Sequence, residues 1–125
     1  MKLTKSELEI MTVLWKEARP LSRGEILNLS EDKSWKDNSI HILLNVMLKK
    51  EAIREDGYVR SGKVWGRLYA ANYTMQDYYA ENLFSKCGAD NLLALYDTLI
   101  RSEEVTPEML DTMEELLQKR KAGRK

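Results

Sequence analysis

This sequence of 125 residues has little that supports a redox, metal or membrane function. It contains a single cysteine, Cys87, which has no partner for an internal disulfide and cannot assemble a metal site alone. No stretch approaches the roughly 20 apolar residues needed to cross a bilayer, and the N-terminus lacks the apolar run of a secretion signal. We therefore expect a soluble cytoplasmic protein without a membrane-inserted segment.

The sequence is also poor in residues arranged for catalysis. The one histidine, His41, has no sequence neighbours that indicate a triad or a metal site, and a general base needs a positioned partner. The glycines form no phosphate-binding loop. The pairs Glu103-Glu104 and Glu114-Glu115 are more typical of exposed helix or loop charges than of acid–base catalysis. We therefore expect no catalytic residues, no metal and no cofactor, and a protein that is not an enzyme.

Charge is balanced over the whole chain, which has 20 basic and 20 acidic residues. A nucleic-acid binder needs clustered cations, so zero net charge alone argues against that function. However, residues 1–74 contain 13 basic and 10 acidic residues, whereas residues 75–125 contain 7 and 10, so the two parts carry charges of +3 and −3. This asymmetry indicates that the two parts have different roles.

Capping residues predict two helices in the first 30 residues. The first helix is predicted to start at Thr4 or Ser6, whose hydroxyl groups can accept hydrogen bonds from the free amides of the first turn. Pro20 ends this segment. Ser22 and Glu25 have the spacing of a capping box, which predicts the start of a second, short helix.

A third helix is predicted over residues 37–50, where apolar residues repeat with a helical period. Its other face is either an ordinary solvated surface or the surface that enters a DNA major groove with its N-terminal residues at the base edges. The indole of Trp35, just before the helix, either pins the loop or lies against the DNA backbone. The candidate DNA-binding residues of this segment are Ser34, Trp35, Lys36, Asn38, Ser39, His41, Ile42 and Asn45.

A β-hairpin is predicted after the third helix. Aromatic and β-branched residues over 54–59 and 64–69 favour two strands, and Ser61-Gly62 marks the turn between them. No acidic residue occurs from 57 through 67. Three short helices followed by a basic hairpin is the order of a winged helix. The hairpin residues expected to bind the DNA backbone are Arg60, Lys63 and Arg67.

The chain is predicted to be helical again from Thr74. Cys87-Gly88 is expected to break this region, and Thr106-Pro107 combines an N-cap with proline at the first helical position. The segment 91–101 is apolar around too much of its circumference for a helix on the surface of a monomer, so association with a second copy is expected. The residues expected at the dimer interface are Leu92, Leu95, Tyr96, Leu99, Ile100, Met109, Met113, Leu116 and Leu117.

These elements together predict a mainly α fold with a small β-hairpin wing. We expect a winged helix-turn-helix domain over residues 1–74 and a C-terminal helical dimerisation domain over residues 75–125. Two linked DNA-binding domains bind with a high effective concentration, so a homodimer would turn weak contacts to each half-site into useful affinity.

Two segments resemble the penicillinase repressor family. The opening Leu3–Trp15 has a pattern of Ser, alternating Glu, Met and Trp that is similar to the start of the first helix in that family. The second segment is similar to the family's recognition helix and the start of its wing. It comprises Trp35, Ser39-Ile40, Leu43-Leu44, Leu48-Lys49-Lys50 and Ala52-Ile53, and Tyr69 and the helical tail extend the resemblance over nearly the whole chain.

The resemblance implies a dimeric repressor that binds palindromic operator DNA upstream of antibiotic-resistance or transport genes, with a membrane sensor protease as an upstream regulator. The chain departs from the family at Ile42, Val46 and Glu51, where Thr, Arg and Gly are frequent. Around Tyr96-Asp97 the Asn-Phe cleavage site of β-lactam-responsive members is not evident, and the cysteine-rich motif of copper-responsive members is absent. DNA binding and dimerisation are therefore carried over, and the inducing signal is not.

Two other functions compete with DNA binding. One is a winged-helix module for protein interaction, in which the helix face around Ile42 and Val46 contacts a protein. The other is a small-molecule sensor, although aromatic residues at helical spacing are usually core, and core packing is also the expected role of Trp15 and Trp65. The aromatic residues that would surround such a ligand are Trp65, Tyr73, Tyr78 and Tyr79.

Overall fold

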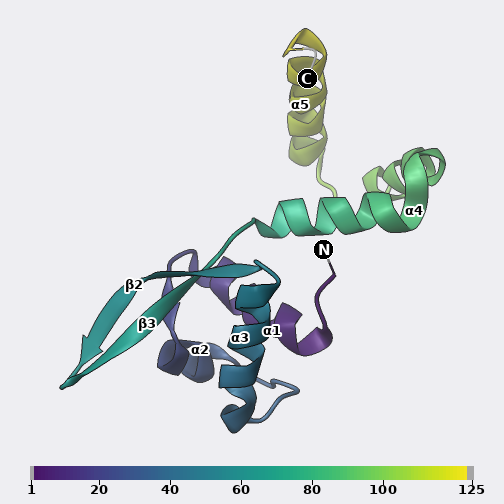
Figure 1. Cartoon of the computed structure of the whole chain (residues 1–125). Helices are drawn as coiled ribbons and strands as arrows, with labels where there is room; N and C mark the ends of the chain where they lie inside the picture. The colour runs from purple at the N-terminus through teal and green to yellow at the C-terminus, as the bar shows by residue number, and fades with distance from the viewer. Residues whose placement is uncertain (1, 124–125) are drawn as a thin grey trace. The chain divides into compact units, whose positions relative to one another are not determined.

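The computed structural model describes residues 2–123, so Met1, Arg124 and Lys125, at the outer ends of the two expected domains, lie outside it. The chain divides into a first unit that ends at Asn82 and a second unit that starts at Leu83, and each is described by itself (Figure 1). The first unit thus includes the beginning of the helix that follows the wing. The predicted domain boundary at residue 74 stays a prediction.

The three predicted helices of the first unit are present as α1 (Lys5–Glu17), α2 (Arg23–Leu29) and α3 (Ile40–Lys49), with a 3-10 turn, η1 (Asp37–Ser39), leading into α3. Thr4, not Ser6, caps α1: Thr4 Oγ1 accepts from the Glu7 amide at 3.3 Å, and Glu7 Oε1 accepts from the Thr4 amide at 2.9 Å. Ser22 and Glu25 make the same reciprocal pair at the start of α2. At both predicted helix starts, capping hydrogen bonds therefore satisfy backbone amides that have no partner within the helix.

The wing is the hairpin of β2 (Ile53–Ser61) and β3 (Val64–Ala71), which projects beyond the helices of its unit (Figure 1). A two-residue strand, β1 (Leu21–Ser22), pairs antiparallel with β3 and completes a sheet of order β1-β3-β2. This strand is too short to show an alternating pattern, so the sequence did not predict it. Gly62 turns the hairpin at a φ of 66°, in the left-handed region where glycine has no steric penalty.

The core of the first unit lies where α1, α2 and α3 meet the base of the sheet. Its largest fully buried side chains are Ile10, Met11, Leu21, Ile26, Leu44, Met47 and Ile53. One acidic residue lies among them: Glu7 is 3% exposed, and Lys50 Nζ donates to its Oε1 at 2.6 Å. This ion pair ties the start of α1 to the end of α3, which fixes α3 at the surface of the unit.

The second unit consists of helices alone. In α4 (Met75–Ile100) the backbone leaves helical geometry at Gly88, with φ 72° and ψ 165°, which confirms the predicted break. Thr106 Oγ1 accepts from the Met109 amide at 3.1 Å and caps α5 (Pro107–Gly123), as predicted. With the small antiparallel sheet of the first unit, the predicted class of winged helix plus helical region is confirmed. None of the helices described is long and apolar enough to span a membrane.

Candidate nucleic-acid interface

Helix α3 turns one face to the core and the other to solvent. Ile40, Leu44 and Met47 are at most 2% exposed and fix the helix by its inner face. The outer face exposes the predicted His41, Ile42 and Asn45, together with Val46 and Lys49. Ile42 is 68% exposed. A helix held this way can enter a groove without disturbing the core.

A hydrogen bond fixes the orientation of His41 on that face. Arg23, at the start of α2, lies with its guanidinium nitrogen 2.9 Å from His41 Nδ1. Arginine can only donate, so Nδ1 is the acceptor and the ring proton is on Nε2. His41 therefore presents its Nε2–H as the remaining donor, and Arg23 becomes part of the same surface.

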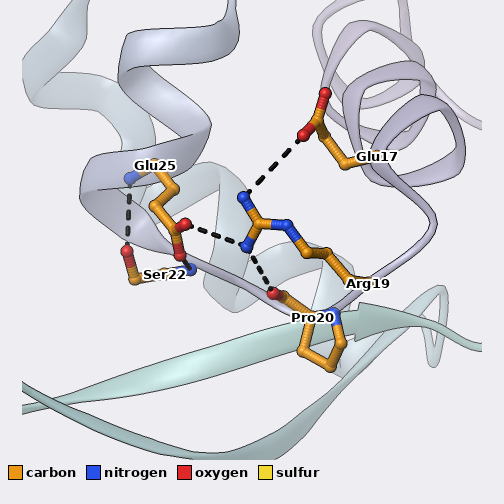
Figure 2. Close-up of polar contacts among 5 residues, drawn as sticks. All are labelled: Glu17, Arg19, Pro20, Ser22 and Glu25. Carbon is orange, nitrogen blue, oxygen red and sulfur yellow. Dashed lines mark hydrogen bonds and ion pairs between the residues drawn. The ribbon is translucent and has the colours of Figure 1, made fainter.

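A polar cluster lies at the turn between α1 and α2, at the start of the helix that carries Arg23 (Figure 2). Arg19 donates to Glu25 Oε2 at 2.9 Å and to the Pro20 carbonyl at 3.4 Å, and it lies 3.8 Å from Glu17. The Ser22 amide and, next, the Arg19 guanidinium hydrogen-bond the Glu25 carboxylate and hold its pKa below the ordinary value. The cluster anchors the first turn of α2 at the edge of the surface formed by α3.

A groove of about 530 Å³ separates the outer face of α3 from the wing. Its helical wall carries donors from Arg23, His41 and Asn45. Its wing wall is mainly apolar, with Val59, Val64 and Trp65 beside Arg67. None of the described residues that line the groove is acidic, so it can accept an anionic chain without repulsion.

The wing cations differ in their surroundings. Arg67 forms an ion pair with Glu55 at 2.7 Å, so its charge is partly offset. Arg60 lies over the Trp65 ring, with its guanidinium carbon 5.8 Å from the ring centroid, and donates to the Gly62 carbonyl at 2.8 Å. Lys63 is exposed in the turn. Arg60 and Lys63 are therefore the cations best placed for phosphate contact.

The loop before α3 is held by Trp35. This residue is only 8% exposed, so its side chain pins the loop to the core, one of the two roles considered, and does not lie on the surface. Lys33 Nζ lies 5.5 Å from its ring centroid and 2.7 Å from Asp37. The predicted Ser34, Lys36 and Asn38 are exposed around it, and Ser39 is half-buried. The Ser34 amide also donates to Glu9 at 2.9 Å, which anchors the loop to α1.

The expectation that Trp65 packs in the core is wrong, because 63% of its surface is exposed on the wing. Trp15, in contrast, is partly buried against the core and donates from Nε1 to the Tyr73 carbonyl at 2.8 Å. Its ring lies 5.8 Å from that of Tyr78 and 6.3 Å from that of Tyr79. The aromatic cluster expected for a ligand thus forms around Trp15, as packing, and without Trp65.

Two residues of the groove were not anticipated as part of a DNA-binding surface. Arg23 carries no local signal, because only the fold brings the start of α2 against α3. Trp65 could have been identified from the missing acidic residues on either side of it, which already indicated an anionic partner for this hairpin. No group of three or more His, Cys, Asp or Glu side chains within residues 2–123 is arranged to hold a metal ion.

The second unit carries the residues predicted for dimerisation, and five of the nine are exposed to solvent. Tyr96, Leu99, Met109, Leu116 and Leu117 are 39–60% exposed. The remaining residues of that set, half-buried in the single chain, are Leu92, Leu95, Ile100 and Met113.

Comparison with known proteins finds similarity over almost the full length of the chain. A family model described as penicillinase repressor matches residues 3–119. The chain is also 21% identical, over 127 residues, to the penicillinase repressor of Bacillus licheniformis, and the match covers 99% of this chain and 95% of that protein.

Proposed function

The chain belongs to the penicillinase repressor family, a family of transcriptional repressors, and we propose that it is a homodimer that binds palindromic operator DNA through its winged helix. The observation that carries the proposal is the groove between α3 and the wing, whose described lining residues include no acidic side chain. We place its action in the cytoplasm, at genes for antibiotic resistance or transport. No catalytic step is required of it.

In this proposal α3 enters the major groove and the wing follows the neighbouring backbone. His41 donates from Nε2 and Asn45 offers both a donor and an acceptor to base edges, while Ile42 can contact a thymine methyl group. Arg60, Lys63 and Arg67 bind phosphates, and Arg23 joins them from α2. Trp35 acts through the loop it pins, and Ser34, Lys36, Asn38 and Ser39 lie at the start of the reading helix.

Dimerisation through the second unit completes the proposal. Its exposed leucine, methionine and tyrosine side chains would be buried against a second copy, and two linked winged helices would then read two half-sites. A membrane sensor protease as the upstream regulator remains a prediction from the family. The Asn-Phe cleavage site of the β-lactam-responsive members is not evident around Tyr96-Asp97, so the proposal assigns no inducing signal.

The decisive experiment is a gel-shift titration of the full chain on the DNA upstream of its own gene. Arg60→Ala with Lys63→Ala should weaken binding to all sequences and lower the slope of log K against log salt by about 0.9 for each phosphate that is no longer neutralised. Lys16→Ala, which removes an exposed cation of α1, is the matched control and should leave the slope unchanged. Absence of binding at low salt would overturn the proposal.

One observation favours a second candidate, a protein-interaction module. Ile42 and Val46 are 68% and 37% exposed on the outer face of α3, and together they form an apolar strip. Affinity capture from extract with and without nuclease separates the two functions. A partner that survives nuclease and competes with operator DNA would favour the protein interface.

A further inference from the structure

The first unit contains a second hollow, separate from the groove between α3 and the wing. It has a volume of about 810 Å³, and its walls come from the second half of α1, the base of the wing and the start of α4. Its described lining shares no residue with that of the groove. Its volume lies within the roughly 300–1,000 Å³ that is typical of sites for small molecules.

Most of the wall of this hollow is apolar. Its lining includes the rings of Trp15 and Tyr73, together with Pro20, Ala71 and Met75. The Nε1 atom of Trp15 already donates to the Tyr73 carbonyl at 2.8 Å, so Trp15 contributes its apolar ring surface to the hollow. Aromatic and apolar walls of this kind bind the apolar body of a small molecule.

Hydrogen bonds hold these walls in place. The bond from Trp15 ties α1 to the segment that leads into α4. At the base of the wing, Arg54 Nη1 donates to the Ala71 carbonyl at 2.9 Å and to Asn72 Oδ1 at 3.2 Å. The Asn72 side chain in turn donates to the Glu51 carbonyl at 2.8 Å. A hollow with fixed walls needs little rearrangement to receive a ligand, which lowers the free-energy cost of binding.

The charged side chains of the lining decide which ligand this hollow accepts. The backbone favours neither sign, because the negative end of α1 and the positive start of α4 both line it. Three cations and one acid, Asp56, belong to the described lining. Arg19 is paired with Glu25 at 2.9 Å, and Arg54 lies 3.7 Å from Asp56. Lys16 forms no ion pair within residues 2–123, so one positive charge is left unmatched.

We propose that this hollow binds a small organic anion that carries one carboxylate on an aromatic body. Lys16, in the last turn of α1, pairs with the carboxylate, while Trp15 and Tyr73 pack against the aromatic ring. A single unmatched cation fits a monocarboxylate and not a dianion, because the second charge of a dianion would be desolvated without a partner. This site goes beyond the proposed function and does not depend on DNA binding.

The test is an NMR titration of the full-length protein with phenylacetate and with its neutral analogue phenylacetamide. Phenylacetate should bind saturably with a Kd of about 1 mM, and phenylacetamide about fivefold more weakly. Lys16→Ala should reduce the affinity for phenylacetate to that for the amide and leave the affinity for the amide unchanged, because only the ion pair is removed. Lys16 is exposed, so the substitution leaves the fold intact.

Lys5→Ala is the matched control for this titration. It removes an exposed cation at the other end of α1, outside the lining of the hollow, and should bind both compounds as the parent does. Lys16 itself lies outside the lining of the groove between α3 and the wing, so operator binding without the small ligand does not involve it.

The indole N–H signals of the three tryptophans locate the site in the same titration. Trp15 lines the hollow, whereas Trp35 in the loop before α3 and Trp65 on the wing do not. The Trp15 signal, assigned through its nuclear Overhauser contacts with Tyr73, should shift with saturation, and the other two should stay in place. No saturable shift up to about 10 mM phenylacetate, equal affinity for the carboxylate and the amide, or shifts confined to Trp35 or Trp65 would overturn the inference.

Discussion

The two units differ in how they bury their apolar residues. In the first unit, side chains such as Ile10 and Met47 are fully enclosed by three helices and the sheet. Among the described residues 83–123 none is buried, and Leu93 is 75% exposed. The first unit is therefore a folded domain in its own right, whereas the second has the composition of a core without the surface that would cover it.

Size explains the difference. The second unit starts at Leu83 and contains only the later part of α4 and the helix α5, too few elements to enclose a core. Apolar helices of this length gain stability from packing and not from intrinsic propensity. In the proposed homodimer a second copy would supply the missing surface, and association would then be part of folding in this unit.

The largest effect is expected where a charge is placed in the second unit. Leu99→Asp puts a carboxylate on a residue that is 52% exposed in the single chain, so it should be harmless to a monomer and disruptive to a dimer. We expect the dimer to dissociate to monomers in analytical ultracentrifugation. Operator affinity should fall by about 100-fold, because the linked second domain no longer contributes an effective concentration.

Ile10→Ala is the matched change in the first unit. It should lower the free energy of unfolding by about 2–5 kcal/mol at every protein concentration, because the cavity lies inside one chain. The loss of stability in Leu99→Asp should instead depend on concentration. A Leu99→Asp protein that stays dimeric would show that the second unit pairs through another surface.

Local signals predicted the helices well and tertiary contacts poorly. The sequence identified the caps Thr4, Ser22 and Thr106 because a cap and the amides it satisfies lie within one turn. It identified the helix break at Gly88 because that break depends on the local residues. Strand β1 was missed, and Trp65 was assigned to the core from its aromatic character alone. Exposure depends on which elements pack against a residue, and that information is distributed over the whole chain.

The same limit applies to the candidate site. Asn38, His41 and Asn45 were selected from helical periodicity, and the structure leaves all three exposed. Arg23 was not selected, since its hydrogen bond to His41 joins residues of different helices. The buried pair of Glu7 and Lys50 is also nonlocal, because 43 residues separate its members along the chain.

A smaller effect is expected from Glu7→Gln, which tests how the first unit is held together. Burial alone would raise the pKa of Glu7, but hydrogen bonds from Lys50 and the Thr4 amide and the charge of Lys50 outweigh it, so the pKa lies below the ordinary 4.5. Glutamine can still accept from Thr4 but has no charge. At pH 7 we expect a loss of about 1–2 kcal/mol in urea unfolding, because Lys50 loses its ionic partner.

The pH dependence of unfolding tests the direction of the Glu7 pKa shift. A carboxylate whose pKa is lowered by folding contributes its stability above its unfolded pKa, and this contribution is lost as the pH falls through the folded value. The difference in free energy of unfolding between the parent and Glu7→Gln should therefore be largest at pH 7 and shrink below about pH 4. Glu25→Gln, at the half-buried capping box of α2, is the control with a smaller change. A Glu7→Gln difference that is constant from pH 7 to pH 3 would contradict the assigned ion pair.

The smallest effect comes from removing one cap in each unit. Ser22→Ala and Thr106→Ala each delete a hydroxyl that accepts a backbone amide at a helix start, at a cost of about 1 kcal/mol. Calorimetry should show the Ser22 change as lower stability independent of concentration, because α2 belongs to a closed core. The Thr106 change should appear in the dimer dissociation constant, because α5 is stabilised by what it packs against. If both changes lowered unfolding stability equally at all concentrations, the second unit would have to be a self-sufficient fold, and its exposed leucines would need a different explanation.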